Sequence, residues 1–124
     1  MPHPVIWFEV VGKDVQALKQ FYGDLFGWQI QDAPGDIPYA MAQTDPEQPP
    51  MGGIGPDPSG GNGHVTWYAE ADDLQGMLDK AESLGGKTVM PPTEPMQGTS
   101  IALFTDPEGH LIGLVKPGPP PPQG

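Results

Sequence analysis

Residues 7–27 read WFEVVGKDVQALKQFYGDLFG, and residues 66–86 read TWYAEADDLQGMLDKAESLGG. Each stretch begins with a short apolar run, passes through an acidic residue into an amphipathic pattern, and ends at a glycine. A shift of 59 positions places Asp14 on Asp73 and Gly27 on Gly86. A strand–helix unit that recurs at about half the chain length predicts two similar modules.

The composition limits the class of protein. The chain has 124 residues, enough for one domain with a single core, and its 18 glycines and 18 prolines indicate long loops. It has no cysteine, which excludes disulfides, thiolate nucleophiles and cysteine-ligated metals. No stretch approaches the roughly 20 apolar residues of a membrane span, and the first residues lack a signal-peptide pattern. We therefore expect a cytoplasmic protein with no membrane partner.

The charge balance is strongly acidic. Five basic residues stand against 16 acidic ones, giving a net charge of −11, and all five are lysine. Nucleic-acid binding is not expected, because it depends on neutralising phosphates with basic side chains. Without arginine there is no guanidinium to bind a carboxylate or phosphate in bidentate fashion. The field of the protein favours cations, although acidity that serves only solubility is an alternative.

The hydrophobic periodicity predicts a single α+β domain over residues 1–116, with a βαβββ order in each module. Module one (4–55) is expected to have strands at 5–10, 28–32, 39–43 and 51–55, with a helix between Asp14 and Gly27. Residues 56–63 form the linker. Module two (64–116) is expected to have strands at 64–71, 87–90, 100–105 and 110–116, with a helix that begins at Asp72 or Asp73. Residues 117–124 are expected to be an extended, disordered proline-rich tail.

Two motifs point to a family. FYGDLFGW at residues 21–28 and FTDPEGHLIGL at 104–114, together with the internal repeat, resemble the vicinal oxygen chelate superfamily, also called the glyoxalase/bleomycin-resistance/dioxygenase family. The resemblance covers residues 4–116. It implies that each module forms a cupped mixed sheet and that the sheets enclose a ligand cavity. In enzymes of this family, four strands supply His, Gln or Glu ligands to a divalent metal there.

The positions equivalent to those metal ligands lack suitable side chains in this sequence. By the family pattern they are Trp7, Thr66, Gly113 and a fourth position near Gly52–Ile54. None offers a carboxylate or an imidazole, so we expect no metal and no cofactor. His64 lies two residues before Thr66, and three roles stay open for it: a metal ligand, a hydrogen-bonding group in the cavity, or a residue of the strand edge or loop.

Strand alternation gives the residues expected to line the cavity. If Ile6, Phe8 and Val10 pack under the helix, Trp7 and Glu9 face the other side. The repeat and the last strand complete the expected ligand-binding set, which is Trp7, Glu9, His64, Thr66, Tyr68 and Gly113. The structural alternatives are that Trp7 fills the space of the missing metal, that Glu9 reaches solvent or a lysine, and that Tyr68 only packs. Trp28 and Trp67 are expected to be core residues on the helix side.

Two functions remain open from the sequence. One is a metal-independent binding protein that sequesters a cationic or aromatic small molecule, as the resemblance to bleomycin-resistance proteins implies. The other is a glyoxalase-, lyase- or dioxygenase-like enzyme of the same fold acting on a small organic substrate. A homodimer is expected in either case, because Trp7 and Tyr68 on the concave faces would form an apolar patch.

Overall fold

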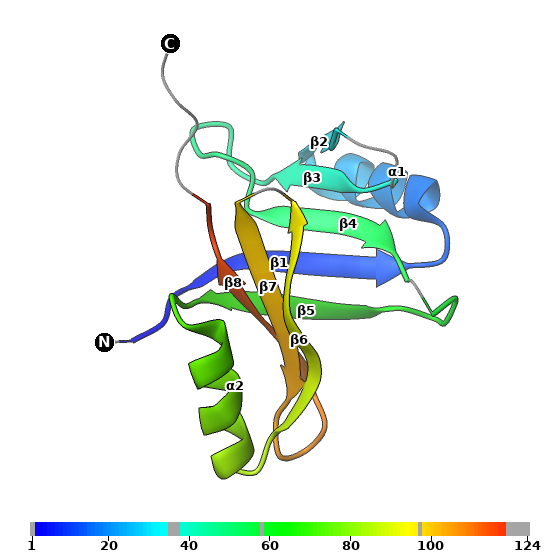
Figure 1. The fold of residues 1–124 in the computed structure, drawn as a ribbon. Helices are drawn as coiled ribbons and strands as arrows, with labels where there is room; N and C mark the ends of the chain where they lie inside the picture. Colours follow the sequence, from blue (N-terminus) through cyan, green and yellow to red (C-terminus); the bar gives the residue numbers. More distant parts are fainter. Residues whose placement is uncertain (1, 35–37, 58, 97, 119–124) are drawn as a thin grey trace. The chain divides into compact units, whose positions relative to one another are not determined.

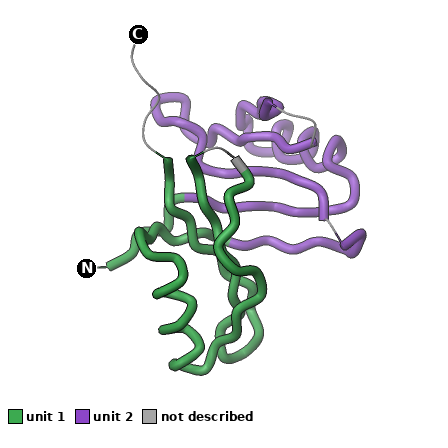
Figure 2. The backbone as a smooth tube through the Cα atoms, in the orientation of Figure 1, with its two compact units in different colours: residues 1–6, 67–124 green, residues 7–66 purple. Residues whose placement is uncertain are grey.

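The computed structural model describes residues 2–34, 38–57, 59–96 and 98–118. The chain separates into two compact units, coloured in Figure 2. Residues 7–66 form what we call the N-terminal unit, and residues 67–124 together with residues 1–6 form the C-terminal unit. The division falls within two strands, after Ile6 and after Thr66, and each strand is described with the unit that holds most of it. None of the described helices is long and apolar enough to cross a membrane. Part of the predicted tail, residues 119–124, lies outside the described residues.

The N-terminal unit has the predicted βαβββ order (Figure 1). Its elements are β1 (Val5–Gly12), α1 (Val15–Phe26), β2 (Gln29–Asp32), β3 (Ala40–Gln43) and β4 (Gly52–Pro56). The strands lie in the order β2-β3-β4-β1, and β1 and β4 run parallel while the other pairs are antiparallel. Glu9 is the register partner of Gly53 in the parallel pair.

The C-terminal unit repeats this topology with different residues. Its elements are β5 (His64–Glu70), α2 (Leu74–Ser83), β6 (Lys87–Met96), β7 (Thr99–Thr105) and β8 (Leu111–Lys116). The strand order is β5-β8-β7-β6, again with a parallel pair, β5 and β8. Tyr68 is the register partner of Gly113. The α+β fold with two βαβββ modules is therefore confirmed.

Both helices begin and end where the local sequence predicts. The Asp14 carboxylate accepts a hydrogen bond from the Ala17 amide at 3.0 Å, and Asp73 accepts one from the Gly76 amide at 2.9 Å. Such N-caps satisfy amides that the first helical turn leaves without partners. Gly27 ends α1 with φ 72°, a left-handed conformation that glycine adopts without steric cost. The start of α2 at Asp73 decides between the two predicted caps.

The two units bury their cores in different ways. In the C-terminal unit, a cluster of buried residues joins α2 to the sheet: Ala69, Ala71, Leu74, Leu78, Ala102 and Leu114. In the N-terminal unit the buried apolar residues come from strands, and none of the twelve residues of α1 is buried. There, the ring of Phe8 lies 5.6 Å from that of Trp28, which also stacks on Phe26 at 4.8 Å. Phe8 and Trp28 thus face the helix side, as predicted, but Trp28 is half-buried rather than a fully buried core residue.

Two sequence expectations about module two are wrong. Trp67 is 45% exposed rather than part of the core, because α2 packs on β6, β7 and β8 and does not cover this part of β5. Strand β6 continues to Met96 instead of ending at Met90. The prolines at 91 and 92 argue against a strand, but β6 is the last strand in its unit's order and its pairing with β7 shifts register there. A strand edge tolerates residues that lack an amide hydrogen.

Candidate functional site

Three side chains on one face of the N-terminal sheet form a hydrogen-bonded network. The Trp7 indole nitrogen Nε1 donates to the Tyr39 hydroxyl at 3.1 Å, and that hydroxyl donates to Glu9 Oε2 at 2.9 Å. Trp7 and Glu9 come from β1, and Tyr39 immediately precedes β3. All three are half-buried, so the network borders solvent. We call these residues the Trp7–Tyr39–Glu9 network.

The direction of these hydrogen bonds is fixed by chemistry. An indole N–H can only donate, so the Tyr39 oxygen must accept from Trp7. The hydroxyl proton of Tyr39 is then directed to Glu9, whose carboxylate must accept it. The network therefore holds the Glu9 side chain in place and presents a carboxylate beside two aromatic rings.

The position of Tyr39 depends on glycines in β4. A Cβ atom at Gly53 would overlap the Tyr39 hydroxyl, and one at Gly55 would lie 2.7 Å from the ring atom Cδ2. The ring thus lies directly against the backbone of β4. Tyr39 was missed in the sequence analysis. The available signal was the glycine-rich strand itself, because glycine in a strand often marks close approach of another group.

The equivalent place in the C-terminal unit is also covered by a tyrosine. Tyr68 is only 5% exposed, and a Cβ atom at Gly113 would overlap its ring. The structure thus brings these two predicted site residues together, with the ring filling the space above the glycine. Thr66, two residues before Tyr68 on β5, is 3% exposed.

The side chains at the positions of the family's metal site do not fit a divalent metal. Trp7 uses its ring nitrogen as a hydrogen-bond donor, and Thr66 offers only a hydroxyl. Position 113 is glycine, and the stretch Gly52–Ile54, where the fourth ligand would lie, has no polar side chain. Among the described residues no group of three or more His, Cys, Asp or Glu side chains could hold a metal ion. Zinc, nickel and manganese sites need imidazole, carboxylate or thiolate donors. The described donor set is thus unsuited to the chemistry of the metal-dependent family members.

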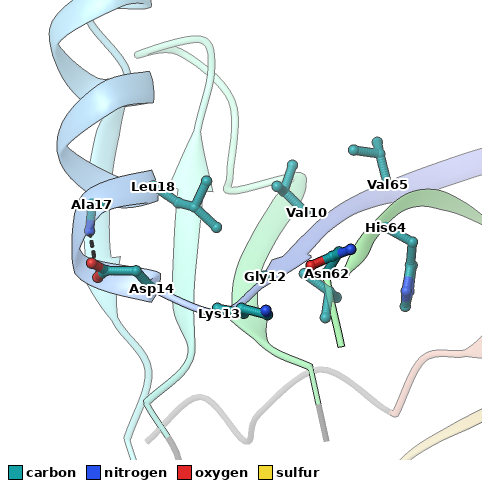
Figure 3. A pocket seen from close by; sticks show the side chains of 11 residues that line it. Val10, Gly12, Lys13, Asp14, Ala17, Leu18, Asn62, His64 and Val65 are labelled. Carbon is teal, nitrogen blue, oxygen red and sulfur yellow. Dashed lines mark hydrogen bonds between the residues drawn. The ribbon is translucent and has the colours of Figure 1, made fainter. Parts of the chain in front are cut away.

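His64 lies at a different place in the N-terminal unit. It borders a hollow of about 420 Å³ between the start of α1, the end of β1 and the start of β5 (Figure 3). None of Trp7, Glu9 and Tyr39 lines this hollow. Of the three roles considered for His64, a metal ligand is disfavoured by the absence of a cluster of donors around it within the described chain.

A loop organised by Asp57 positions His64. The Asp57 carboxylate accepts hydrogen bonds from the hydroxyl and amide of Ser59 at 2.7 and 2.9 Å and from the Gly63 amide at 3.0 Å. These bonds, with the Ser59 hydroxyl contributing most, lower the pKa of Asp57 below its ordinary value. Ser59 and Gly63 in the linker between the modules are therefore held to Asp57 by hydrogen bonds.

Comparison with known proteins gives the family. The model of the Glyoxalase/Bleomycin resistance protein/Dioxygenase superfamily matches residues 5–114. "Putative glyoxylase CFP32" of Mycobacterium tuberculosis is 32% identical over 115 residues, covering 87% of this chain and 43% of that relative. "Anthracycline biosynthesis protein DnrV" of Streptomyces peucetius is 28% identical, covering 94% of this chain and 48% of the relative. The chain thus spans less than half the length of these curated relatives.

Solved structures have the same fold at low sequence identity. Methylmalonyl-CoA epimerase from Mycobacterium tuberculosis superposes with a TM-score of 0.65 at 19% identity, over 93% of this chain and 88% of that one. Hypothetical protein BH1468 from Bacillus halodurans superposes with a TM-score of 0.69 at 10% identity, over 99% of this chain and 100% of that one. Together with the family match over residues 5–114, the repeated βαβββ topology establishes that this chain belongs to the glyoxalase/bleomycin-resistance/dioxygenase superfamily.

Proposed function

We propose that this chain is a metal-independent binding protein of the superfamily that takes a cationic or neutral aromatic small molecule at the Trp7–Tyr39–Glu9 network. The observation that carries the proposal is the carboxylate of Glu9 held by the Tyr39 hydroxyl beside the Trp7 indole. A carboxylate next to aromatic faces suits a positive group, through charge-assisted hydrogen bonding and cation–π attraction.

The charge of the whole chain supports a cationic ligand. At a net charge of −11, with no arginine, the protein attracts cations and offers little compensation to an anion. The described residues also offer no cluster of donors suited to a metal ion, the group that would attract an oxygen-rich, anionic substrate. One relative carries a name that links it to anthracycline biosynthesis.

The test uses three naphthalene ligands that carry a positive, a neutral and a negative group. Binding of 1-naphthylmethylamine, 1-naphthylmethanol and 1-naphthoate is measured by calorimetry with the wild type, Glu9→Gln, Trp7→Ala and the control Glu47→Gln, which changes an exposed glutamate in the same unit. We expect the amine to bind most tightly. Glu9→Gln should weaken the amine about tenfold and leave the alcohol unchanged. Trp7→Ala should weaken all three, and Glu47→Gln none.

Two results would count against the binding proposal. The first is tighter binding of the naphthoate than of the amine. The second is an amine affinity that Glu9→Gln leaves unchanged, since the charge of Glu9 is then irrelevant to the ligand.

A second candidate function is an acid–base enzyme of the same fold that uses no metal. The observation that favours it is the same carboxylate, since Glu9 is positioned to accept a proton from a small organic substrate, and one relative is named as a glyoxylase. This candidate function is tested by adding methylglyoxal and a thiol to the protein and measuring the formation of the thioester. Turnover that Glu9→Gln abolishes and that added chelator leaves unchanged would favour the enzyme over the binding protein.

A further inference from the structure

The loop between β4 and β5 contains the chain's single asparagine. Asn62 is exposed to solvent and is followed by Gly63. An asparagine side chain loses ammonia when the backbone nitrogen of the next residue attacks its carbonyl carbon, Cγ. Glycine obstructs that attack least, because it has no side chain and its backbone moves most freely. The pair is therefore a place where the backbone can modify its own side chain.

The fold requires glycine at position 63. Gly63 has a φ of 83°, in the left-handed region, and a Cβ atom there would overlap the carbonyl oxygen of Val11. A larger residue, which would hinder the attack on Asn62, is thus excluded by packing. Protection of Asn62 can come only from other contacts of the loop.

One such contact engages the reacting nitrogen itself. The Gly63 amide donates a hydrogen bond to Asp57 Oδ2 at 3.0 Å. Asp57 Oδ1 accepts from the hydroxyl and the amide of Ser59 at 2.7 and 2.9 Å, so both oxygens of the carboxylate are engaged. The lowered pKa of Asp57, caused chiefly by the Ser59 hydroxyl, keeps this group ionised at neutral pH. A negative charge beside the Gly63 N–H disfavours loss of its proton, which the attack requires.

We propose that Asn62 is a deamidation site and that the Asp57 carboxylate slows its reaction in the folded protein. In the reaction, the Gly63 nitrogen gives up its proton and forms a bond to Asn62 Cγ. The bond from Cγ to the side-chain nitrogen breaks, and ammonia leaves with that proton. Water then adds to either carbonyl of the cyclic imide, and the ring opens to aspartate or isoaspartate. No oxidant or reductant is needed.

Both products alter the hollow of about 420 Å³ that Asn62 borders together with Lys13 and His64 (Figure 3). Each product places a new carboxylate at its edge. In isoaspartate the backbone also runs through the former side chain and gains an extra carbon atom. This atom enters the chain next to Gly63, which has no spare room against Val11. The isoaspartate form should therefore be less stable than the aspartate form.

The test follows deamidation of the full chain near neutral pH by peptide mapping. Folded wild type is compared with Asp57→Ala and with the control Asp72→Ala, which removes an exposed carboxylate outside the loop. We expect Asp57→Ala to react about tenfold faster than wild type, because hydrogen bonds to charged groups are the stronger ones, and Asp72→Ala to react at the wild-type rate. In urea all three chains should react at one common, faster rate, because unfolding removes the loop contact.

Circular dichroism of each variant verifies that it is folded. If Asp57→Ala does not fold, Asp57→Asn replaces it. The asparagine added by that change precedes Pro58, which has no amide hydrogen, so it cannot react in the same way. A folded wild type that reacts as fast as the unfolded chain would overturn the proposal. Equal rates in folded wild type and the folded Asp57 variant would also overturn it, as would an Asn62 that stays intact in the unfolded chain.

Discussion

At the scale of single residues, the tyrosine of each module determines the character of the site. Tyr39 connects Trp7 to Glu9 through two hydrogen bonds, and its ring covers the backbone at Gly53. Tyr68 covers Gly113, its register partner on β8. The repeated fold thus places a tyrosine ring over a glycine in each unit, and at Tyr39 the hydroxyl also donates to a carboxylate.

Tyr39→Phe tests the hydrogen bonds separately from the ring. The phenylalanine keeps the packing against β4 but cannot accept from Trp7 or donate to Glu9. We expect a loss of about 1 kcal/mol in the free energy of unfolding, measured by urea denaturation. Tyr22→Phe is the matched control, because the Tyr22 hydroxyl makes no hydrogen bond within the described residues. An equal effect of the two changes would show that the network contributes nothing to stability.

Asp57→Asn tests the linker loop through its pH dependence. The folded pKa of Asp57 lies below its ordinary value, so its ionised form stabilises the folded state. That contribution is complete above the ordinary aspartate range, near pH 4, and is lost as the pH falls towards the lowered pKa. The difference in stability between wild type and Asp57→Asn should therefore shrink between about pH 6 and pH 3.

The matched control for the loop is Asp72→Asn, which removes one negative charge at an exposed position. The measurement is urea denaturation at several pH values. If the difference between wild type and Asp57→Asn were the same at every pH, the hydrogen-bonded carboxylate would have no special role in the loop.

At the scale of elements, the two helices place the same residue type, a glycine within the helix, in different surroundings. Each helix contains one interior glycine, Gly23 in α1 and Gly76 in α2. A Cβ atom at Gly23 would lie 3.7 Å from Ile30 Cδ1, an ordinary contact. At Gly76 it would overlap the Asp73 carboxylate that caps the helix.

Gly23→Ala and Gly76→Ala should therefore change stability in opposite directions. Alanine in an unobstructed helix interior stabilises by about 0.5–1 kcal/mol, because glycine loses more conformational freedom on folding. At Gly76 the methyl group disturbs the N-cap, and loss of a cap costs about 1 kcal/mol. Thermal unfolding of the two variants provides the comparison. A stabilised Gly76→Ala would mean that the Asp73 cap moves at no cost.

Most helices and strands could be predicted from residues that lie close together in the sequence. The helix starts at Asp14 and Asp73 depend on a side chain and an amide three residues away, so they can be read from adjacent residues. The helix-facing position of Trp28 followed from strand alternation. The exposure of Trp67 could not be predicted this way, because it depends on which strands α2 covers.

The site was harder to predict than the fold. Trp7 and Glu9 were identified because they alternate on one strand. Tyr39 reaches them only because β3 pairs with β4 and β4 pairs with β1, three segments far apart in sequence. His64 was grouped with the cavity residues by the same alternation rule. The structure places it beside the hollow at the start of α1, because the Asp57 loop fixes that end of β5.

At the scale of the whole molecule, two properties bear on metal binding. They are the side chains at the family's metal-ligand positions and the net charge of the chain. The protein has the fold of metal-dependent enzymes, but its described side chains at the equivalent positions do not suit a metal. Its net charge of −11 makes the folded protein attractive to cations in general. Nonspecific binding of metal ions to surface carboxylates must therefore be distinguished from binding at a site.

We expect chelation to leave the melting temperature unchanged. A ligand that binds only the folded state raises the melting temperature, so removing a bound metal would lower it. The measurement is thermal unfolding with EDTA and with one equivalent of zinc, nickel or manganese, alongside elemental analysis of the purified protein. One equivalent of copurified metal together with a lower melting temperature in EDTA would contradict the expectation.

The tyrosine-covered glycines also constrain which mutational paths are open to this protein over evolutionary time. A carboxylate at Gly113 would add an acidic group at this position, but its Cβ atom would meet the Tyr68 ring. At Gly53 a new side chain meets Tyr39 in the same way. A new side chain at either glycine must therefore follow, or occur together with, the replacement of the tyrosine that covers it. A variant that carried both the new side chain and the tyrosine would be overpacked and therefore unstable. The order of substitutions matters, so a side chain at either glycine requires at least two coordinated changes in its module.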